Sequence, residues 1–486
     1  MKSLLFLNPT KDRYNDIKAD LSALNDLNIG KITSRIVMKY LSLRCTADEI
    51  KARQEIFIAL KSNSFKNAIL MIKENINNLS TAYKAYNNSA NELEKIFNAK
   101  RLCHAYVDTT YDILKLQTGL KLTNRLITDI KDKTPDIKKI EKAEYDTKPV
   151  FNIISDFRLS FDYETNVIKN NIEINDYASR LRKNAVELGL SEGTANHEMS
   201  LGISEQLSAA IIRLYPEEIR VVSVFKDELV SLVDTDLLVL EEELNFYFGV
   251  LEVCEKAEEY GIDVTIPELT EEKQYVAENA YDVTLIYKNE HSIVPNLMFF
   301  YPRKGVYFLT GANGGGKTTY LRAAAVNLIF ALSGCPVFGT GIKFWAFDSV
   351  FSHFPSDERF TDSGRLLEEQ KRIDEILAKT SDKSFVFLNE TFSGTDGVKG
   401  TALAVETAKT IAERGAFLLY ITHFHEVADS KLPMLHTEID TDSENKRTYK
   451  IVIGDGSRSS YAADILRKYN LTKQKLTERF GGRSDA

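Results

Sequence analysis

The chain has 486 residues, of which 43% are hydrophobic and 27% charged, and its formal net charge is −8. This composition is that of a globular protein with ample core material, and the length favours about three domains. It contains no run of about 18 apolar residues and no start resembling a signal peptide, which argues against a membrane-spanning or secreted protein. Four scattered cysteines predict neither a zinc site nor a disulfide framework, and a cytoplasmic location is expected: Cys45, Cys103, Cys254 and Cys335.

The charge is unevenly distributed along the chain. Residues 1–150 contain 26 Lys and Arg against 18 Asp and Glu, a net charge of +8, and the remainder has a net charge of −16. A basic front part suits a polyanionic partner. A solvated helical surface would carry the same charges without any partner, so both interpretations stay open on charge alone.

The first 260 residues are predicted to be mainly helical. Apolar residues recur at three- and four-residue steps over 48–60, 65–76, 80–97, 102–116 and 120–131. The dipeptide Thr134-Pro135 predicts a break, and residues 150–161 are ambiguous between strand and helix. Further helices are predicted over 163–190, 203–214 and 221–260. Long helices with few loops indicate rods or levers rather than a compact enzyme core.

The pattern changes near residue 262 from helices to short strands. Strands are predicted over 264–266, 283–287 and 306–309, and helices then alternate with strands. This order predicts an α/β domain with a largely parallel sheet. We therefore divide the chain into an N-terminal segment (1–24), an all-α core, lever and clamp region (25–260), and an α/β domain (261–486).

Residues 311–318, GANGGGKT, fit the pattern G-x-x-x-x-G-K-[ST] between a predicted strand (306–309) and a predicted helix (319–332). Three consecutive glycines allow the backbone to approach a polyphosphate, and the N–H groups of the loop and helix start face the anion. Lys317 is predicted to reach the outer phosphates, and Thr318 to ligate Mg²⁺. A turn that caps a helix and binds nothing is the alternative. The predicted phosphate-binding residues are Gly311, Ala312, Asn313, Gly314, Gly315, Gly316, Lys317, Thr318 and Thr319.

Two further apolar strands, 385–388 and 418–421, end in polar residues. In nucleotide-hydrolysing α/β sheets, the metal ion and the attacking water lie at the carboxyl ends of such strands. Glu390 is predicted to orient or deprotonate a water, and Asn389 to lie beside Mg²⁺ without bringing a charge. His423 is predicted to contact the γ-phosphate region. Taken alone His423 is better explained as a packed histidine, but the order and spacing of the three motifs favour a functional role.

These motifs resemble the MutS family of DNA mismatch-repair ATPases, a branch of the ABC-type ATPases. The resemblance rests on residues 311–322, 351–369, 389–396 and 422–426, and residues 459–466 are similar to the family's closing helix. It implies that residues 261–486 form an ABC-type P-loop ATPase domain with C-terminal dimerisation helices, which binds ATP and Mg²⁺ and forms a homodimer. The resemblance also implies that Ser363 reaches the partner's nucleotide. A helix N-cap would explain the same serine, and both can hold.

The resemblance extends more weakly to residues 26–60 and 225–260, which are similar to the family's helical core and lever. Because core-like sequence begins near residue 25, the family's mismatch-reading N-terminal domain is not expected, and neither is a nuclease domain after Ala486. Asn389 replaces the family's usual Asp. We therefore expect ATP hydrolysis to be retained but slow.

The function implied by this resemblance is ATP-dependent binding of mismatched or branched DNA in repair or recombination, without a membrane. DNA contacts are expected mainly at phosphates and with little sequence specificity. Candidate contacts, which a solvated surface would also explain, are Lys138, Lys139, Arg180, Arg182 and Lys183. Three alternatives stay open: an ATPase acting on RNA or ribosomes, an ATP-gated clamp without hydrolysis, and a binder of a protein partner.

Overall fold

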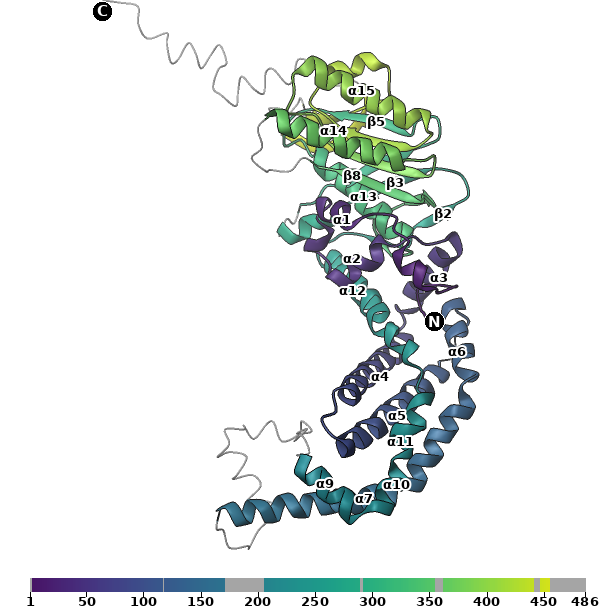
Figure 1. Cartoon of the computed structure of the whole chain (residues 1–486). Helices are drawn as coiled ribbons and strands as arrows, with labels where there is room; N and C mark the ends of the chain where they lie inside the picture. The colour runs from purple at the N-terminus through teal and green to yellow at the C-terminus, as the bar shows by residue number, and fades with distance from the viewer. Residues whose placement is uncertain are drawn as a thin grey trace, which may run out of the picture.

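The structure is a computed structural model that describes residues 2–116, 118–170, 205–288, 292–354, 362–440 and 446–454. The molecule is elongated and curved, with β-sheets at one end and a helical arm at the other (Figure 1). The described N-terminus lies near the junction of the two parts (Figure 1).

The arm and the junction are built from helices. They are α1 (Leu21–Asp26), α2 (Arg35–Ser42), α3 (Ala47–Ala59), α4 (Asn63–Asn87), α5 (Glu92–Leu114), α6 (Lys121–Lys131), α7 (Thr134–Asn170), α9 (Glu205–Leu214), α10 (Pro216–Val222), α11 (Val224–Asp227) and α12 (Val239–Glu259), with short 3-10 helices at Lys11–Asn15, Ile29–Lys31, Leu229–Leu232 and Thr235–Leu238. Helix α12 packs on α2 and α4, α4 pairs with α5, and α7 packs on α5 and α10. Figure 1 shows α12 leading from the sheets to the arm.

Side-chain caps fix where several of these helices begin. Thr46 accepts a hydrogen bond from the Glu49 backbone N–H, and the Glu49 side chain accepts one from the Thr46 N–H, which is a complete capping box at the start of α3. Asn91 caps α5 in the same way through the Glu94 N–H. Pro216 occupies the first turn of α10, where its missing N–H removes no helical hydrogen bond.

Several predicted helix boundaries and one predicted strand differ from the structure. The helix predicted over 221–260 is interrupted before α12, and α5 continues through the break predicted between residues 97 and 102. The break predicted at residues 77–79 lies instead at residues 88–91, between α4 and α5, where the Asn91 side chain caps the start of α5. Residues 150–161, ambiguous in sequence, belong to α7, which contains Pro149. The strand predicted over 283–287 is a 3-10 helix (Val283–Lys288), because Asp282 Oδ1 accepts bonds from both the N–H and the hydroxyl of Thr284.

The larger sheet contains β5 (Val306–Thr310), β8 (Ser349–His353), β9 (Ser384–Asn389), β10 (Phe417–Ile421), β11 (Met434–Asp440) and β12 (Lys446–Ile453), in the order β12-β11-β5-β10-β9-β8. All neighbours pair in parallel except β11 and β12. Every residue of β5 and β10 is buried, as expected for central parallel strands covered on both faces.

A smaller mixed sheet contains β1 (Val264–Thr265), β2 (Glu268–Thr270), β3 (Tyr275–Ala280), β4 (Asn296–Phe300), β6 (Val337–Thr340) and β7 (Lys343–Trp345). Helix α13 (Lys317–Leu332) contacts strands of both sheets, and 13 of its 16 residues are buried. Helices α14 (Asp362–Lys379) and α15 (Gly397–Glu413) lie at the outer end of the molecule beside the larger sheet (Figure 1). The prediction of a largely parallel sheet therefore describes the larger sheet but not the smaller one.

The first 60 residues tie α12 to the C-terminal end of α13. The buried carboxylate of Glu243 on α12 accepts hydrogen bonds from Ser3 Oγ at 2.7 Å, Leu4 N at 2.6 Å and Tyr14 OH at 2.8 Å. At the end of α13, Lys18 Nζ donates to Ser333 Oγ at 2.8 Å and Arg53 donates to the Ser333 carbonyl at 3.2 Å. Cations at a helix C-terminus are favoured by the helix dipole.

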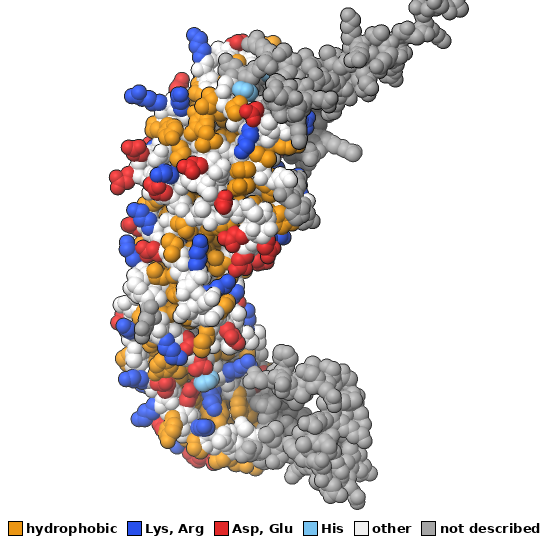
Figure 2. Space-filling model, turned by 180° about the vertical axis from the view of Figure 1, so that it is seen from behind, with side chains coloured by type: hydrophobic (Ala, Val, Ile, Leu, Met, Phe, Trp, Pro, Cys, Tyr) orange, Lys and Arg blue, Asp and Glu red, His pale blue; other side chains and the backbone are white. Residues whose placement is uncertain are grey.

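Lys and Arg side chains are scattered over the surface. On the face shown in Figure 2, they alternate with Asp and Glu along the length of the molecule and do not gather in one patch. None of the described helices has an apolar stretch of the length that crossing a bilayer requires.

Candidate functional site

Three neighbouring strands of the larger sheet bring the three polar motifs to one edge. In the sheet β10 lies between β5 and β9, and Ile421 at the end of β10 is in register with Leu309 on one side and Asn389 on the other. Because parallel strands end at the same edge, the glycine loop, Glu390 and His423 follow these ends side by side. The three motifs that the sequence predicted to act together therefore lie close together in space.

The glycine loop between β5 and α13 has a backbone that favours glycine. Gly316, the residue before α13, has φ +96°, and Gly311 has φ +126°. A Cβ on Gly311 would lie 2.3 Å from Thr437 Oγ1, so this position has no room for a side chain. The loop therefore presents bare backbone at the N-terminus of a 16-residue helix, an arrangement that binds anions.

Lys317 is buried at the base of this loop. Its Nζ donates hydrogen bonds to the carbonyl oxygens of Gly311 at 2.8 Å and Ala312 at 3.2 Å, and to Asn313 Oδ1 at 3.4 Å. Burial lowers the pKa of Lys317, and the nearby Glu390 carboxylate opposes this shift. The hydrogen-bond acceptors described for this ammonium are all neutral oxygens. An anion bound in the loop would therefore stabilise the charged form of Lys317.

Thr318 and Asn389 face one another across the strand ends. The Thr318 hydroxyl donates to Asn389 Oδ1 at 3.4 Å, which places two neutral oxygens together beside the loop. Among the described residues, no group of three or more His, Cys, Asp or Glu is arranged to hold a metal ion. Mg²⁺ commonly binds through few protein ligands together with phosphate oxygens and waters, and Thr318 with Asn389 fits that mode.

Glu390 follows β9 in a left-handed conformation, with φ +51°. Its backbone N–H donates to the Ile421 carbonyl at 2.9 Å, which fixes the start of the turn against β10. His423 lies beside it, its ring centroid 4.3 Å from that of Phe424. Burial lowers the pKa of His423, Glu390 opposes the shift, and Lys317 adds to it, so the imidazole is neutral near pH 7.

A pocket of about 620 Å³ opens at this edge. Seven of its lining residues lie on the predicted motifs: Asn313, Gly314, Gly316, Lys317, Thr318, Thr319 and Glu390. His423 and Asn389 are not in its lining, but the charges of Glu390 and Lys317 affect the pKa of His423, and Asn389 accepts a hydrogen bond from Thr318. This size is within the range of small-molecule and cofactor sites.

The remaining lining residues were not predicted from sequence. They are Leu285, Lys288, Ser292, Ile293, Val294 and Tyr449. Tyr449 on β12 has φ +58°, and a Cβ placed on Gly316 would lie 3.6 Å from its ring. These residues come from segments before the loop and more than 100 residues after it. The apolar pair Ile293-Val294 within a polar stretch of sequence is a feature that could have indicated a contact at this site.

Several predicted residues lie elsewhere or outside the described part. Ser363 is in the first turn of α14, which begins at Asp362, so the serine is not the N-cap; its side chain is not described. Arg180, Arg182 and Lys183 lie outside the described residues, as does the segment 459–466. Lys138 and Lys139 are exposed on α7, and Lys139 pairs with Glu228 at 3.1 Å.

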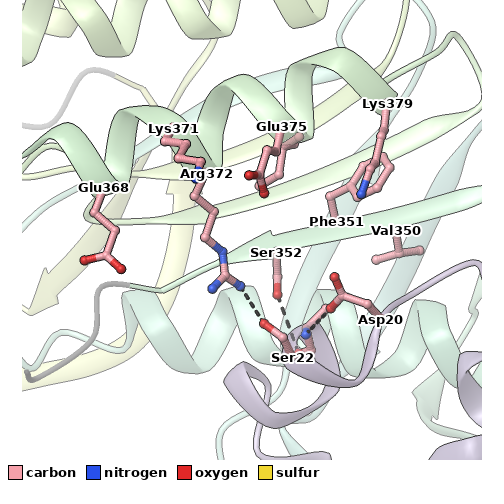
Figure 3. Close-up of a pocket in the computed structure, with 12 residues that line it drawn as sticks. Asp20, Ser22, Val350, Phe351, Ser352, Glu368, Lys371, Arg372, Glu375 and Lys379 are labelled. Atoms are coloured by element: carbon pink, nitrogen blue, oxygen red, sulfur yellow. Dashed lines mark hydrogen bonds between the residues drawn. The ribbon is translucent and has the colours of Figure 1, made fainter.

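A second hollow lies between α14, β8 and α1 (Figure 3). Arg372 extends from α14 across this hollow, and donates to Ser22 Oγ at 2.7 Å and Asp26 Oδ2 at 3.3 Å. Burial raises the pKa of Asp26 to about 6, and Arg372 opposes the shift. The hollow contains none of the predicted nucleotide-site residues, but its polar bridge joins α14 to the N-terminal region.

Comparison with known proteins connects this site to one family. Residues 307–478 match the family model for MutS domain V. This region is therefore a MutS-type domain V. The matched segment includes the glycine loop, Glu390 and His423, the residues that the strand ends bring together.

Curated relatives match the same part of the chain. A DNA mismatch repair protein MutS from Fusobacterium nucleatum is 26% identical over 190 residues, which is 38% of this chain and 21% of the relative. An endonuclease MutS2 from Staphylococcus haemolyticus is 28% identical over 219 residues, 44% of this chain and 27% of the relative. The MutS of Lactobacillus delbrueckii is 29% identical over 195 residues, which is 38% of this chain and 23% of the relative. The matches thus span about a quarter of each relative's length.

Proposed function

We propose that this protein binds ATP with Mg²⁺, hydrolyses it slowly, and acts as a homodimer on mismatched or branched DNA in repair or recombination. The observation that supports the proposal best is the convergence of three strand ends on one pocket. Lys317, Thr318 and Glu390 line that pocket, and Asn389 and His423 lie next to these residues outside its lining.

Each residue has a distinct task in the proposed reaction. Lys317 neutralises phosphate charge, and the loop N–H groups bind the phosphate oxygens. Thr318, with Asn389 beside it, would hold Mg²⁺, which when bound would supply stabilisation of the phosphate charge. Glu390 orients or deprotonates the attacking water, and neutral His423 donates a hydrogen bond toward the γ-phosphate region. Asn389 brings no charge, so the turnover is slow.

The DNA part of the proposal has independent support. Relatives that match this chain are named DNA mismatch repair proteins, and residues 1–150 have a net charge of +8. On the face shown in Figure 2, Lys and Arg are scattered among acidic side chains, so the proposal expects dispersed phosphate contacts rather than a single base-reading patch.

The proposal is tested by ATP turnover of the full chain, alone and with homoduplex, mismatched, four-way-junction and single-stranded DNA at two salt concentrations. We expect slow turnover that mismatched or branched DNA stimulates, with the stimulation lost at the higher salt concentration. Lys317→Ala should abolish turnover and weaken ATP binding roughly 100-fold, because its charge-assisted contacts are lost. Lys343→Ala, which removes an exposed lysine paired with Glu268, is the control and should leave both unchanged.

Two results would contradict parts of the proposal separately. Wild-type turnover equal to that of Lys317→Ala would exclude hydrolysis at this pocket. Turnover that no DNA changes, at either salt concentration, would remove the DNA assignment and favour RNA, ribosomes or a protein partner.

A further inference from the structure

We infer that Glu369 on α14 is a positioning residue for Glu390, and that it links the helix containing Ser363 to the turn that handles water. The inference rests on the proposed role of Glu390. It concerns a residue that does not line the nucleotide pocket and to which the sequence analysis assigned no role.

The link is one buried hydrogen bond between two elements. The backbone N–H of Phe392 donates to Glu369 Oε2 at 2.8 Å. Glu369 is 5% exposed and Phe392 1%, so both groups are shielded from water. A buried carboxylate that accepts from a backbone N–H forms a charge-assisted bond, which is stronger than a bond between neutral groups.

The bond holds a turn whose backbone is otherwise disfavoured. Glu390 has φ +51° and Phe392 has φ +67°, values that residues with side chains rarely adopt. Neutral contacts hold the rest of the turn: the Glu390 N–H donates to the Ile421 carbonyl, and Tyr420 OH donates to the Thr391 carbonyl at 3.1 Å. Among the hydrogen bonds described for residues 390–393, Glu369 provides the charged acceptor. Its loss would let the turn relax and move the Glu390 side chain.

The place of Glu369 on α14 gives the bond a second consequence. Glu369 lies six residues after Ser363, about 9 Å along the helix axis. Three residues further along the helix, Arg372 bonds α14 to Ser22 of α1, as Figure 3 shows. A shift of α14, caused by a nucleotide at its N-terminal end or by the arm through α1, would therefore displace the turn of Glu390.

Three variants test the inference on the full chain. Glu369→Ala removes the acceptor, Glu369→Gln keeps an acceptor oxygen without the charge, and Glu368→Ala removes the exposed neighbour on the same helix as a control. The measurements are the turnover number, the affinity for a fluorescent ATP analogue, and hydrogen exchange of a peptide covering residues 389–396. The exchange measurement does not depend on hydrolysis.

We expect Glu369→Ala to lower the turnover number roughly tenfold or more while ATP affinity changes less than about twofold, since the pocket itself is intact. Exchange at residues 389–396 should become faster, Glu369→Gln should recover part of both properties, and Glu368→Ala should match the wild type. Unchanged exchange in Glu369→Ala would overturn the inference. The inference would also be overturned if Glu369→Ala lowered the turnover number and the ATP affinity by the same factor and Glu369→Gln recovered neither. That result would indicate a general structural role for Glu369. A wild-type enzyme without turnover would contradict the proposed function, and the exchange result would still decide the positioning link.

Discussion

Asn389 brings an amide, and no charge, to the position beside Thr318 where Mg²⁺ is proposed to bind. Its Oδ1 accepts the Thr318 hydroxyl at 3.4 Å. Asn389→Asp would place a carboxylate at the same distance, which binds water-coordinated Mg²⁺ more strongly than an amide does. We expect turnover to rise roughly tenfold and half-maximal activity to require less Mg²⁺, as measured by Mg²⁺ titration of ATPase activity.

The control for this change is Asp396→Asn, a carboxylate that caps α15 in the same loop region. It should alter stability but not the Mg²⁺ requirement. If Asn389→Asp leaves both turnover and the Mg²⁺ midpoint unchanged, Asn389 does not lie next to the metal ion.

Glu243 is fully buried on α12, and burial raises its pKa from 4.5 to about 7, opposed by the bonds from Ser3, Leu4 and Tyr14. Because the folded protein holds this proton more tightly than the unfolded chain, Glu243 makes stability fall as pH rises from about 4.5 to 7. In Glu243→Gln this fall should be smaller. The variant should also be less stable at pH 5 by about 1–3 kcal/mol, since an amide NH2 replaces one of the two oxygens that accept from Ser3, Leu4 and Tyr14.

Thermal unfolding of both proteins at pH 5, 6 and 7 measures this difference. Glu242→Gln is the matched control, because Glu242 is the adjacent carboxylate and pairs with Lys39 at the surface. A slope with pH that is the same in wild type and Glu243→Gln would show that Glu243 is ionised throughout this range.

Local spacing made some residues predictable and left others hidden. The order of Gly316, Lys317 and Thr318 in one short motif specifies their proximity, and the structure brings them to one pocket. Glu369 and Tyr449 reach the site from segments whose position depends on the whole sheet order. A sequence pattern does not state which distant carboxylate will meet a particular backbone N–H.

Helix α13 was predictable because its sequence is apolar on all sides and follows a glycine loop. Such a helix must be buried, and 13 of its 16 residues are. The contacts at its far end were not predictable, because Lys18 and Arg53 reach Ser333 from 315 and 280 residues earlier in the chain. Residues 283–287 were mistaken for a strand, since their apolar content is compatible with either structure and the Asp282 side chain decided the outcome.

Helix α14 is proposed to act across a dimer, and this can be tested with mixed subunits. Ser363→Ala would impair the partner's nucleotide site, whereas Glu390→Ala would impair the subunit's own site. If sites are shared, a mixed dimer joins both changes in one site and leaves the other site unchanged. We therefore expect turnover of mixtures to depart from the linear average of the two variants, as measured over a titration of mixing ratios.

The control mixes Glu368→Ala with Glu390→Ala, because Glu368 is an exposed residue of the same helix. That series should follow simple dilution. Linear behaviour of the Ser363→Ala series as well would exclude a composite site, and would leave each subunit with a complete site of its own.

At the scale of the whole molecule, the curved arm and the sheets are joined by two routes. One is α12, and the other is the first 60 residues, which bond to Glu243 on α12 and to the end of α13. The sequence predicted the helical arm and the α/β part separately. It did not show that the N-terminal residues lie between them, because those contacts depend on single buried polar groups such as Lys18 and Arg53.

Two neighbouring lysines on α7 provide a test of how the arm meets DNA. Both are exposed, but Lys139 already pairs with Glu228 at 3.1 Å, whereas Lys138 has no ion pair among the described residues. Lys138 is therefore more available than Lys139 to bind a DNA phosphate and so displace a counterion from the DNA. Lys138→Ala should weaken binding to branched DNA and reduce the slope of log K against log salt by about 0.9, and Lys139→Ala should change the slope less. Equal slopes for the wild type and both variants, measured by fluorescence anisotropy over a salt series, would place the DNA away from this part of α7.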